Sequence, residues 1–424
     1  MPSVNPNQLT IRPFSHTQKV LGGLAFALGV VFLLGEYERV GDLRIYLAAA
    51  GDFLDGKPIY GGLYGEPALF PYMGSPTLAL LLSPLSFLSL PWPALIWKLL
   101  NILLLMRIWQ LILAYFPADR LEGTLGATFS GASFLAMAFL IYLNFHVVQF
   151  SILLLFSILE GLYRIQARQQ VLSGALVLSL GIICKVIPLV ALPYLAYRGY
   201  FKAALLSAGM VLAWMAFPAM VVGWEYTWAQ NLAWLQTINP ALEDNVFDVS
   251  TRSIHGIGAL VATLTKADIG NPFTLDIRRH VVDLPASVVV GLITLTKAGL
   301  IGMSLYFLQW KSRFSDHRDQ MRQLWELSYI LAITPLVFPQ QRSYGFILLF
   351  PAVAYLMYQL FFSGYSWQKG RKALFVLILI LLNLELILGH FREYYWHFKT
   401  LTYASLMLLG LLAYTPPSQT AKSP

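Results

Sequence analysis

The chain has 424 residues, of which 57% are hydrophobic and only 12% are charged. A soluble domain normally carries about 25% charged residues, so most of this surface cannot face water, and a soluble protein is excluded. The formal net charge of +8 is typical of a membrane protein whose cytoplasmic loops hold the excess Lys and Arg, and we expect membrane lipids rather than nucleic acid as partners. The single cysteine, Cys184, excludes an intramolecular disulfide.

Apolar runs recur along nearly the whole chain and predict one all-α polytopic membrane domain, 1–424, with about 12 transmembrane helices. The runs lie at 18–35, 76–90, 92–114, 126–143, 147–163, 172–184, 186–198, 203–222, 286–309, 325–338, 343–362, 372–390 and 400–414. The first leads into charged residues rather than a small-residue cleavage site, so we expect an uncleaved span. The runs at 76–90, 172–184, 186–198 and 325–338 are shorter than the ~20 residues of a perpendicular span, so we expect tilted, broken or extended helices there.

Lys and Arg residues gather in alternate connections between the runs. They lie at Arg12 and Lys19, Arg164 and Arg168, Arg198 and Lys202, and within 311–322 and 369–372. This pattern predicts cytoplasmic N- and C-termini in a plasma (inner) membrane, with two large outer loops at 36–75 and 223–285. The alternation needs an even number of crossings between 76 and 143, where three runs occur. We therefore expect 126–143 to be re-entrant or a pair of half-helices.

The first outer loop holds the strongest catalytic candidate, Asp42, in the segment GDLRIYLAAAGDFLDGKPIYGG, residues 41–62. If 42–54 is helical, the i+4 spacing places Tyr46 beside Asp42. An interfacial acid can have a shifted pKa and can act as a general base on a sugar hydroxyl. The alternative is an ordinary solvated loop acid.

Lys185 is flanked on both sides by apolar runs, in the segment ICKVIPLV. A lysine in such a place usually faces a cavity or a partner, and its ammonium suits a phosphate at the membrane surface. The alternative is a helix break at Pro188, with Lys185 reaching the lipid headgroups.

The second outer loop contains DVSTRSIHGIGAL, residues 248–260, in which Arg252 and His255 are three apart. A helix start with a nearby cation is an anion site, and the preceding hydroxyls can cap such a helix; these are Ser250, Thr251 and Ser253. The alternative is a solvated loop.

A third polar cluster interrupts the late apolar runs at Gln340, Gln341 and Arg342. Two amides and a guanidinium can clamp a phosphate, a diphosphate or a sugar, although a plain interhelical turn has the same composition. A similar polar break before the run at 147–163 contains Asn144, His146 and Gln149.

No metal-ligand spacing is present, and no phosphate-binding glycine loop or nucleophile elbow occurs. We therefore expect no metal and no cofactor, and an energy-coupled transporter with its own ATPase domain is excluded.

The order of these clusters resembles glycosyltransferase family 87, which comprises polytopic mannosyltransferases of the GT-C superfamily that use polyprenyl-phosphate mannose. The resemblance runs from about residue 38 to 350. It rests on Asp42 to Tyr60, FPYMGSPTLALLLSPLSFL from Phe70, NFHVVQFSILLL, the KVIP at Lys185, STRSIHGIGAL, and the turn at Gln340–Arg342.

The chain departs from the family pattern at three of these motifs. The family often has Tyr-Pro-Pro where this chain has Tyr72-Met73-Gly74-Ser75-Pro76, and Gly-Gln where it has Val148-Gln149. The late turn, commonly rich in His, is here Gln-Gln-Arg. These positions would contact the donor or the acceptor, so the departures bear on which sugar and which acceptor are used.

The resemblance implies that Asp42 deprotonates an acceptor hydroxyl, which attacks the anomeric carbon with inversion. It implies donor-phosphate binding by Lys185, Arg252, His255 and Arg342, and substrate binding by Tyr46, Tyr60, Tyr72, Asn144, Gln149, Gln340 and Gln341. The reaction would move a hexose, with mannose expected, from a polyprenyl-phosphate sugar donor to a lipid or glycan acceptor on the outer face.

Two alternatives stay open. One is transfer of another sugar, a pentose or glucose, on the same fold. The other is a non-enzymatic lipid-linked sugar flippase or transporter. A transporter commonly has interrupted helices in two repeated halves, and no such repeat is visible in the sequence.

Overall fold

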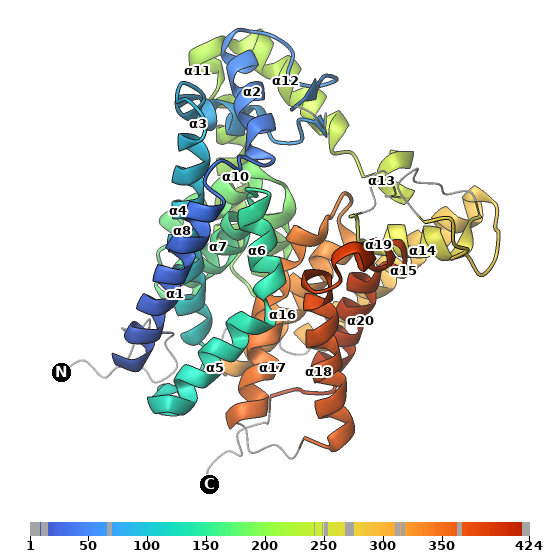
Figure 1. Ribbon diagram of the computed structural model, residues 1–424. Coiled ribbons are helices and arrows are strands. Elements are labelled where there is room, and N and C mark those ends of the chain that lie inside the picture. The colour runs from blue at the N-terminus through green and yellow to red at the C-terminus, as the bar shows by residue number, and fades with distance from the viewer. Residues whose placement is uncertain are drawn as a thin grey trace. The chain divides into compact units, whose positions relative to one another are not determined.

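The computed structural model describes residues 9, 16–65, 70–240, 242–247, 249, 253–267, 275–309, 314, 319–362 and 367–417. The described residues are mostly helical, as expected (Figure 1). The departure from an all-α chain is small. In the first predicted outer loop, strands β1 (Leu63–Tyr64) and β2 (Phe70–Pro71) form a two-stranded antiparallel sheet.

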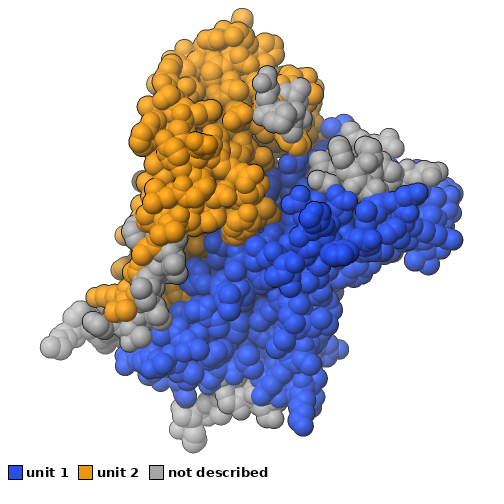
Figure 2. Space-filling model, viewed as in Figure 1, with its two compact units in different colours: residues 1–7, 114–141, 240–424 blue, residues 8–113, 142–239 orange. Residues whose placement is uncertain are grey.

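The chain forms two compact units, each made of stretches that are distant in sequence (Figure 2). Unit 1 comprises residues 1–7, 114–141 and 240–424, and unit 2 comprises residues 8–113 and 142–239. The chain leaves unit 2 after helix α4 and returns to it within helix α6. A single domain over 1–424 stays a prediction.

Unit 2 contains the first predicted outer loop and the helices around it. Its helices are α1 (His16–Gly35), α2 (Leu43–Leu54), α3 (Pro76–Ser86), α4 (Trp92–Leu113), α7 (Ser151–Leu162), η2 (Tyr163–Ala167), α8 (Val171–Cys184), η3 (Ile187–Val190), α9 (Ala191–Tyr197), α10 (Phe201–Ala216), α11 (Ala219–Val222) and α12 (Trp224–Thr237). Helix α8 packs against α7 and α10, while α2, α3 and α12 gather at one end of the unit (Figure 1).

Small residues bring α7 and α8 close together. A Cβ at Gly174 would lie 2.9 Å from the Gly161 carbonyl oxygen, and a Cβ at Gly181 would lie 1.9 Å from Ser157 Oγ. Close backbone approach through small residues is the usual way in which apolar helices associate in lipid. The α7–α8 pair therefore forms a tightly packed wall of unit 2.

A buried ion cluster joins α4 to α7. The Glu160 carboxylate is 3% exposed and accepts hydrogen bonds from Arg107 Nε at 2.9 Å and from Arg164 Nε at 2.7 Å. A charge between apolar helices is tolerated when it is paired in this way.

Unit 1 contains the C-terminal helices. Its elements are η1 (Ala118–Leu121), α5 (Gly123–Ala136), α13 (Glu243–Phe247), α14 (Ile257–Thr265), α15 (Ala286–Leu308), α16 (Gln320–Val337), η5 (Ser343–Leu349), α17 (Phe350–Phe362), α18 (Lys369–Asn383), η6 (Leu384–Leu386), η7 (Gly389–Phe391), α19 (Arg392–His397) and α20 (Thr400–Ala413). Helix α6 (Ala138–His146) crosses the boundary between the units. Helices α16, α17, α18 and α20 run side by side (Figure 1).

Two polar side chains of α16 are hydrogen-bonded to backbone carbonyls of neighbouring helices. Trp325 Nε1 donates to the Leu412 oxygen at 2.8 Å, and the Tyr329 hydroxyl donates to the Leu300 oxygen at 2.6 Å. Such pairing is required where water is absent. Aromatic stacking adds to the packing, with the Phe307 and Tyr329 ring centroids 3.8 Å apart.

Among the described residues, four helices are long and apolar enough to cross a membrane. They are Trp92–Leu113, Phe201–Val222, Ala286–Leu308 and Ser343–Phe362. Two bent pairs raise the number to six if each is one span. One of them joins α5 to α6 with a bend of 56°, so the apolar run expected at 126–143 is broken into two helices, and its re-entrant course stays a prediction.

The lengths of the apolar helices agree with the apolar runs in several places. Helices α3, α8, the η3–α9 pair and α20 are shorter than a full span, as expected for the first three. The chain is thus a membrane protein by its apolar helices, while the count of about 12 crossings stays a prediction.

Candidate active site

The connection between α1 and α2 carries Asp42 and is fixed to the turn between α6 and α7. The Asp42 backbone N–H donates to the Val147 oxygen at 2.9 Å. Gly41 has a φ of +56°, and a Cβ there would lie 2.4 Å from the same oxygen. Position 41 therefore requires glycine for two reasons, its left-handed backbone conformation and this close approach.

The Asp42 side chain is held from the same turn. Gln149 Nε2 donates to Asp42 Oδ2, and Gln149 is itself 2% exposed. Its backbone oxygen accepts a hydrogen bond from Trp97 Nε1 at 3.1 Å, and its backbone N–H donates to the Asn144 oxygen at 2.9 Å. Asp42, Asn144 and Gln149 are thus brought together as one network.

Val148 explains one departure from the family pattern. Its φ is +52°, in the left-handed region that a β-branched residue rarely adopts. The family often has glycine there, and glycine adopts this conformation without strain. The tight turn that presents Gln149 to Asp42 is therefore kept although valine has replaced the favoured residue.

Asp42 stands directly before a helix, whereas the sequence hypothesis placed it in the first turn of a helix over 42–54. Helix α2 begins at Leu43, and Asp42 is its N-cap residue without a side-chain capping bond. The carboxylate is directed to Gln149 instead. An aspartate that does not cap its own helix keeps its carboxylate for another role.

Three predicted substrate-binding tyrosines, Tyr46, Tyr60 and Tyr72, form a cluster, and Tyr46 belongs to α2, the helix that follows Asp42. The Tyr46 and Tyr72 ring centroids lie 5.5 Å apart, and those of Tyr60 and Tyr72 lie 5.7 Å apart. The Tyr60 and Tyr72 hydroxyls donate to the Gly74 and Ser75 oxygens, both at 2.7 Å. Tyr46 and Tyr72 are buried, so they shape the wall of the site, and their contact with substrate stays a prediction.

The segment that contains Lys185 lies next to this cluster. Burial raises the pKa of Tyr72 well above its usual 10, and the nearby Tyr60, Tyr46 and Cys184 raise it further. Cys184 is the last residue of α8, and Lys185 follows it directly. The helix break expected here is confirmed, because α8 ends at Cys184 and η3 begins at Ile187. Both interpretations of Lys185 stay open.

A second set of contacts joins the α1–α2 connection to the end of α6, and the sequence did not predict it. His146 Nδ1 lies 3.1 Å from Glu36 Oε2 and 3.0 Å from Arg39 Nη1. Lys98 Nζ donates to the Glu36 oxygen at 2.6 Å and to the Arg39 oxygen at 2.9 Å. These contacts fix the chain before Asp42, and no spacing in the sequence indicates them.

We expect Gly41→Ala to lower kcat by about 100-fold, because a misplacement of about 1 Å in a catalytic group can have that effect. The added Cβ would push the connection away from Val147 and displace Asp42. Gly51→Ala is the matched control, since Gly51 lies in α2 with open space around its Cβ. Initial rates of sugar transfer measure the effect. Equal rates for both variants would contradict the role given to Gly41.

In unit 1, two predicted segments pair with each other. Ile254 and Arg342 form an antiparallel bridge, the His255 N–H donates to the Gln341 oxygen at 3.0 Å, and the Ser343 N–H donates to the Ser253 oxygen at 3.2 Å. The STRSIHGIGAL segment and the late turn, about 87 residues apart in sequence, thus form one local structure. Arg342 and His255 belong to it.

A buried lysine supports this pair of segments. Lys399 is 2% exposed, and its Nζ donates to the Ile254 oxygen at 2.8 Å. Thr402 Oγ1 donates to the His255 oxygen at 2.7 Å. Sequence reasoning missed Lys399 because it directly precedes an apolar run and looks like an ordinary flanking cation.

The surroundings of His255 favour the neutral form of its imidazole. The side chain is fully buried, and among the described residues neither ring nitrogen has a hydrogen-bond partner. Burial, and then the charge of Lys399, lower its pKa well below 6.5. His255 can therefore offer an N–H to a phosphate but not a positive charge.

This shifted pKa predicts a pH-dependent stability. The unfolded chain takes up a proton at His255 as the pH falls below 6.5, whereas the folded chain does not, so folding weakens on the acid side by up to ~1.4 kcal/mol per pH unit. Thermal unfolding in detergent between pH 7.5 and 5 should show a shallower acid-side loss for His255→Gln than for the wild type. The exposed His390 provides the control, and His390→Gln should keep the wild-type slope. Identical slopes for the wild type and both variants would contradict this account of His255.

The two glutamines of the late turn have defined partners. Gln340 has a φ of +59° and donates from Nε2 to Asn245 Oδ1 at 3.1 Å. Gln341 is 3% exposed and donates from Nε2 to the Pro339 oxygen at 3.0 Å. Both side chains shape the turn, and their contact with substrate stays a prediction.

Two expectations for the second outer loop need comment. Arg252, Ser250 and Thr251 lie outside the described residues. The capping role expected for Ser253 is wrong, because α14 begins at Ile257 with Gly256 as its N-cap. Gly256 adopts the extended conformation that a cap needs. Ser253 lies three residues before this cap position.

The sequence profile of glycosyltransferase family 87 matches residues 72–339. The chain belongs to glycosyltransferase family 87. This confirms the resemblance over its central part, which includes Tyr72, Asn144, Gln149, Lys185 and His255. Asp42 lies before the matched residues and Arg342 lies after them, and the roles of all these residues stay predictions.

A curated relative is the polyprenol-phosphate-mannose-dependent alpha-(1-2)-phosphatidylinositol mannoside mannosyltransferase of Mycobacterium tuberculosis (strain ATCC 25618 / H37Rv). It is 26% identical over 263 residues, which cover 59% of this chain and 60% of the relative. The chain therefore matches about three fifths of the length of that protein.

Proposed function

We propose that this protein is a membrane glycosyltransferase that moves a hexose, with mannose expected, from a polyprenyl-phosphate sugar to a hydroxyl of a lipid or glycan acceptor. The observation that carries the proposal is the fixed position of Asp42 in a family 87 chain. Its backbone is bound to Val147, and its carboxylate is bound to Gln149. The curated relative, by its name, uses polyprenol-phosphate mannose, which supports the same donor class here.

In this reaction Asp42 accepts the proton of the acceptor hydroxyl, which a positioned carboxylate can do as a general base. The acceptor oxygen forms a bond to the anomeric carbon while the bond from that carbon to the phosphate oxygen breaks. The electron pair of the broken bond leaves with polyprenyl phosphate. Attack from the side opposite the leaving group inverts the anomeric configuration.

The leaving phosphate gains negative charge, so fixed cations stabilise the transition state. Lys185 and Arg342 are candidates by the family resemblance, and Arg252 is a candidate by its sequence motif. His255 would contribute a neutral N–H. We propose no metal in this role. The donor tail would lie among apolar helices, where each buried CH₂ contributes about 0.8 kcal/mol.

The proposed site faces the outer side of the plasma (inner) membrane, and both termini are cytoplasmic. The supporting observation is that Asp42 follows an apolar helix with Arg12 before it, Lys19 in its first turn and no acidic residue before it, as the positive-inside rule favours for a cytoplasmic N-terminus.

The experiment that tests the donor is a panel of polyprenyl phosphates carrying mannose, glucose or a pentose, each given to the purified protein with an envelope lipid extract. The proposal expects the mannose donor to give the highest kcat/KM and a product of inverted configuration. A higher kcat/KM for the glucose or pentose donor would identify another sugar on the same fold, and a retained configuration would contradict the mechanism.

A further inference from the structure

Three arginines gather in unit 2 where α4 and α7 lie side by side (Figure 1). Arg107 and Arg164 both bond to the buried Glu160 carboxylate. Arg107 and Arg168 both approach the Tyr163 ring, with their Cζ atoms 5.8 and 5.7 Å from its centroid. One carboxylate and one phenol ring thus join the three guanidiniums into a single group, which we call the arginine cluster.

The turn η2 explains why Arg168 belongs to this cluster. Its backbone N–H donates to the oxygen of Tyr163, five residues earlier, at 3.2 Å, which is the pairing of a π-helix. Its Nε donates to the Tyr163 hydroxyl at 2.9 Å. Single π-helical turns occur frequently at functional sites. The wider turn here holds a third cation beside the two that share Glu160.

The arginine cluster carries more positive charge than unit 2 balances. Glu160 is the only acidic residue in the stretches 67–113 and 142–224, which make up most of that unit. Three guanidiniums of unit 2 therefore share one carboxylate, and two positive charges remain. Charges near apolar helices are most stable when they are paired, so an anion that reaches the cluster is bound favourably.

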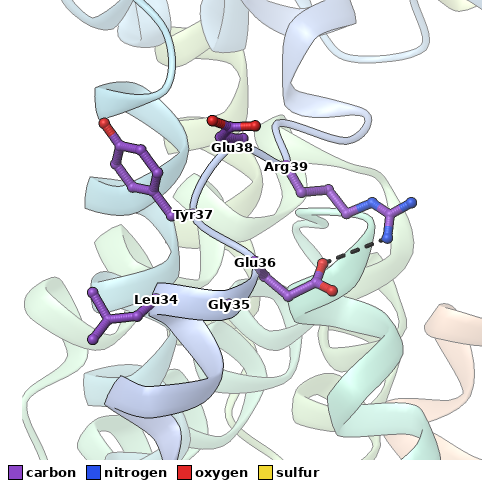
Figure 3. Close-up of a pocket in the computed structure, with 6 residues that line it drawn as sticks. All are labelled: Leu34, Gly35, Glu36, Tyr37, Glu38 and Arg39. Atoms are coloured by element: carbon purple, nitrogen blue, oxygen red, sulfur yellow. Dashed lines mark ion pairs between the residues drawn. The ribbon is translucent and has the colours of Figure 1, made fainter.

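A second charged site in unit 2 has the opposite balance. The pocket of about 320 Å³ lined by residues 34–39 contains two carboxylates, Glu36 and Glu38, and one guanidinium, Arg39 (Figure 3). Like charges repel, so these lining residues disfavour an anion. The excess of positive charge is therefore a local feature of the arginine cluster.

Two arginines of the cluster offer donors to a ligand. Arg164 and Arg168 bond through Nε, at 2.7 Å to Glu160 and at 2.9 Å to Tyr163. Within the described ranges, no hydrogen bond engages the terminal nitrogens of either side chain. The Arg164 side chain is 36% exposed, and Arg168 is exposed. A guanidinium binds a phosphate through two parallel hydrogen bonds, and a side chain already held in place loses less entropy on binding.

Exposed apolar side chains flank the cluster on α4 and α8. Leu103 is 62% exposed and lies one turn before Arg107 on the same face of α4. Leu172 and Leu176 are 66% and 46% exposed and share one face of α8, beginning four residues after Arg168. Leucine is favoured in the hydrocarbon of a membrane. A ligand at the cluster therefore meets phosphate-binding groups and an apolar surface together.

We propose that the arginine cluster binds the phosphate of an anionic phospholipid, with Arg164 and Arg168 as its direct partners and its acyl chains against α4 and α8. Basic sites between transmembrane helices on the cytoplasmic side are typical sites for anionic headgroups, and the 163–170 connection is cytoplasmic in the orientation proposed above. The site is separate from the surroundings of Asp42. Gln149 lies before the start of α7, whereas Glu160 lies in its last turn.

The test titrates delipidated protein in neutral detergent with phosphatidylglycerol or phosphatidylcholine, and native mass spectrometry measures the bound lipid. The wild type should bind phosphatidylglycerol at least about 10-fold more tightly than phosphatidylcholine, because the cluster attracts a negative headgroup. Arg168→Gln should raise the Kd for phosphatidylglycerol by about 10-fold, the low end for hydrogen bonds to a charged group. Arg168 is exposed and bonds to Tyr163 rather than to the buried Glu160, so thermal unfolding should be unchanged.

Lys202→Gln is the matched control for Arg168→Gln. Lys202 is an exposed cation in the first turn of α10, on the same predicted side of the membrane, and its loss changes the net charge equally. This variant should keep the wild-type Kd. Equal Kd values for the wild type and Arg168→Gln would overturn the site, and so would equal losses of affinity in Arg168→Gln and Lys202→Gln.

Adding inorganic phosphate to the lipid-bound protein distinguishes a lipid from a soluble ligand. Phosphatidylglycerol should stay bound, because inorganic phosphate has no acyl chains to contact α4 and α8. Displacement of the lipid by an equal concentration of phosphate would overturn the lipid class, and equal affinities for the two phospholipids would overturn the anionic class. No sugar donor is present in any arm, so the result does not depend on the proposed function.

Discussion

Replacing Asp42 with asparagine is expected to lower kcat for sugar transfer by at least about 1,000-fold, near the upper end of what general-base catalysis supplies. Asparagine keeps the size of the side chain and an oxygen that can accept the Gln149 hydrogen bond, but it cannot take the proton. Donor binding should therefore stay within about 2-fold of the wild type. Single-turnover transfer from radiolabelled donor measures the chemical step.

Asp55→Asn is the matched control for Asp42→Asn. Asp55 follows the same helix, and its carboxylate is 62% exposed and pairs with Lys57 at 2.8 Å. This variant should transfer sugar at the wild-type rate. Retained sugar transfer by Asp42→Asn would contradict the assignment of Asp42 as the base. Equal losses of transfer rate in both variants would indicate a general effect on the first outer loop.

The second large effect is expected at Arg342. Arg342→Gln should lower kcat/KM for the donor by about 100-fold, because hydrogen bonds to a charged group contribute about 1.5–3 kcal/mol. Arg342 is held by its bridge to Ile254, whose carbonyl oxygen accepts a hydrogen bond from Lys399. Product inhibition by polyprenyl phosphate should weaken in parallel, since the leaving phosphate is the proposed partner.

Arg120→Gln serves as the control for Arg342→Gln. Arg120 is 61% exposed and lies 3.7 Å from Asp119 in η1, so its loss should leave the kinetic constants of the donor unchanged. If Arg342→Gln raises the acceptor KM and leaves the donor constants alone, the late turn binds acceptor and not phosphate.

The spacing of residues around Asp42 predicts much of its setting. The hypothesis of a helix over 42–54 agrees with the structure, which has α2 at Leu43–Leu54 and Asp42 as its N-cap residue. The partner of the carboxylate, Gln149, is 107 residues away. The polar break at 144–149 marks that turn as a candidate, but only tertiary contacts show that it meets Asp42.

The features missed in the sequence share a physical cause. Glu36, His146 and Lys399 look like flanking polar residues beside apolar runs, and their importance lies in burial and in long-range contacts. Gly41 looks like any turn glycine until its φ of +56° and the nearby Val147 oxygen are known. The local sequence pattern indicates where a helix lies or is interrupted. Which two interrupted segments contact each other depends on the whole fold.

The capping role expected for Ser253 failed because its segment takes part in another local structure. Ser253 has the right chemistry for a cap, but it lies in the segment that pairs with the late turn. Its backbone is used for that pairing, and α14 starts after Gly256 instead. Extended pairing and helix capping cannot both use the same few residues.

The most direct test of the central claim uses the purified protein in liposomes that contain radiolabelled polyprenyl-phosphate mannose and an envelope lipid extract. The account predicts that wild type moves the label onto an acceptor and releases polyprenyl phosphate, whereas Asp42→Asn does neither. Movement of intact labelled donor between the two leaflets, without transfer and equally in both proteins, would contradict it and favour a lipid-linked sugar flippase.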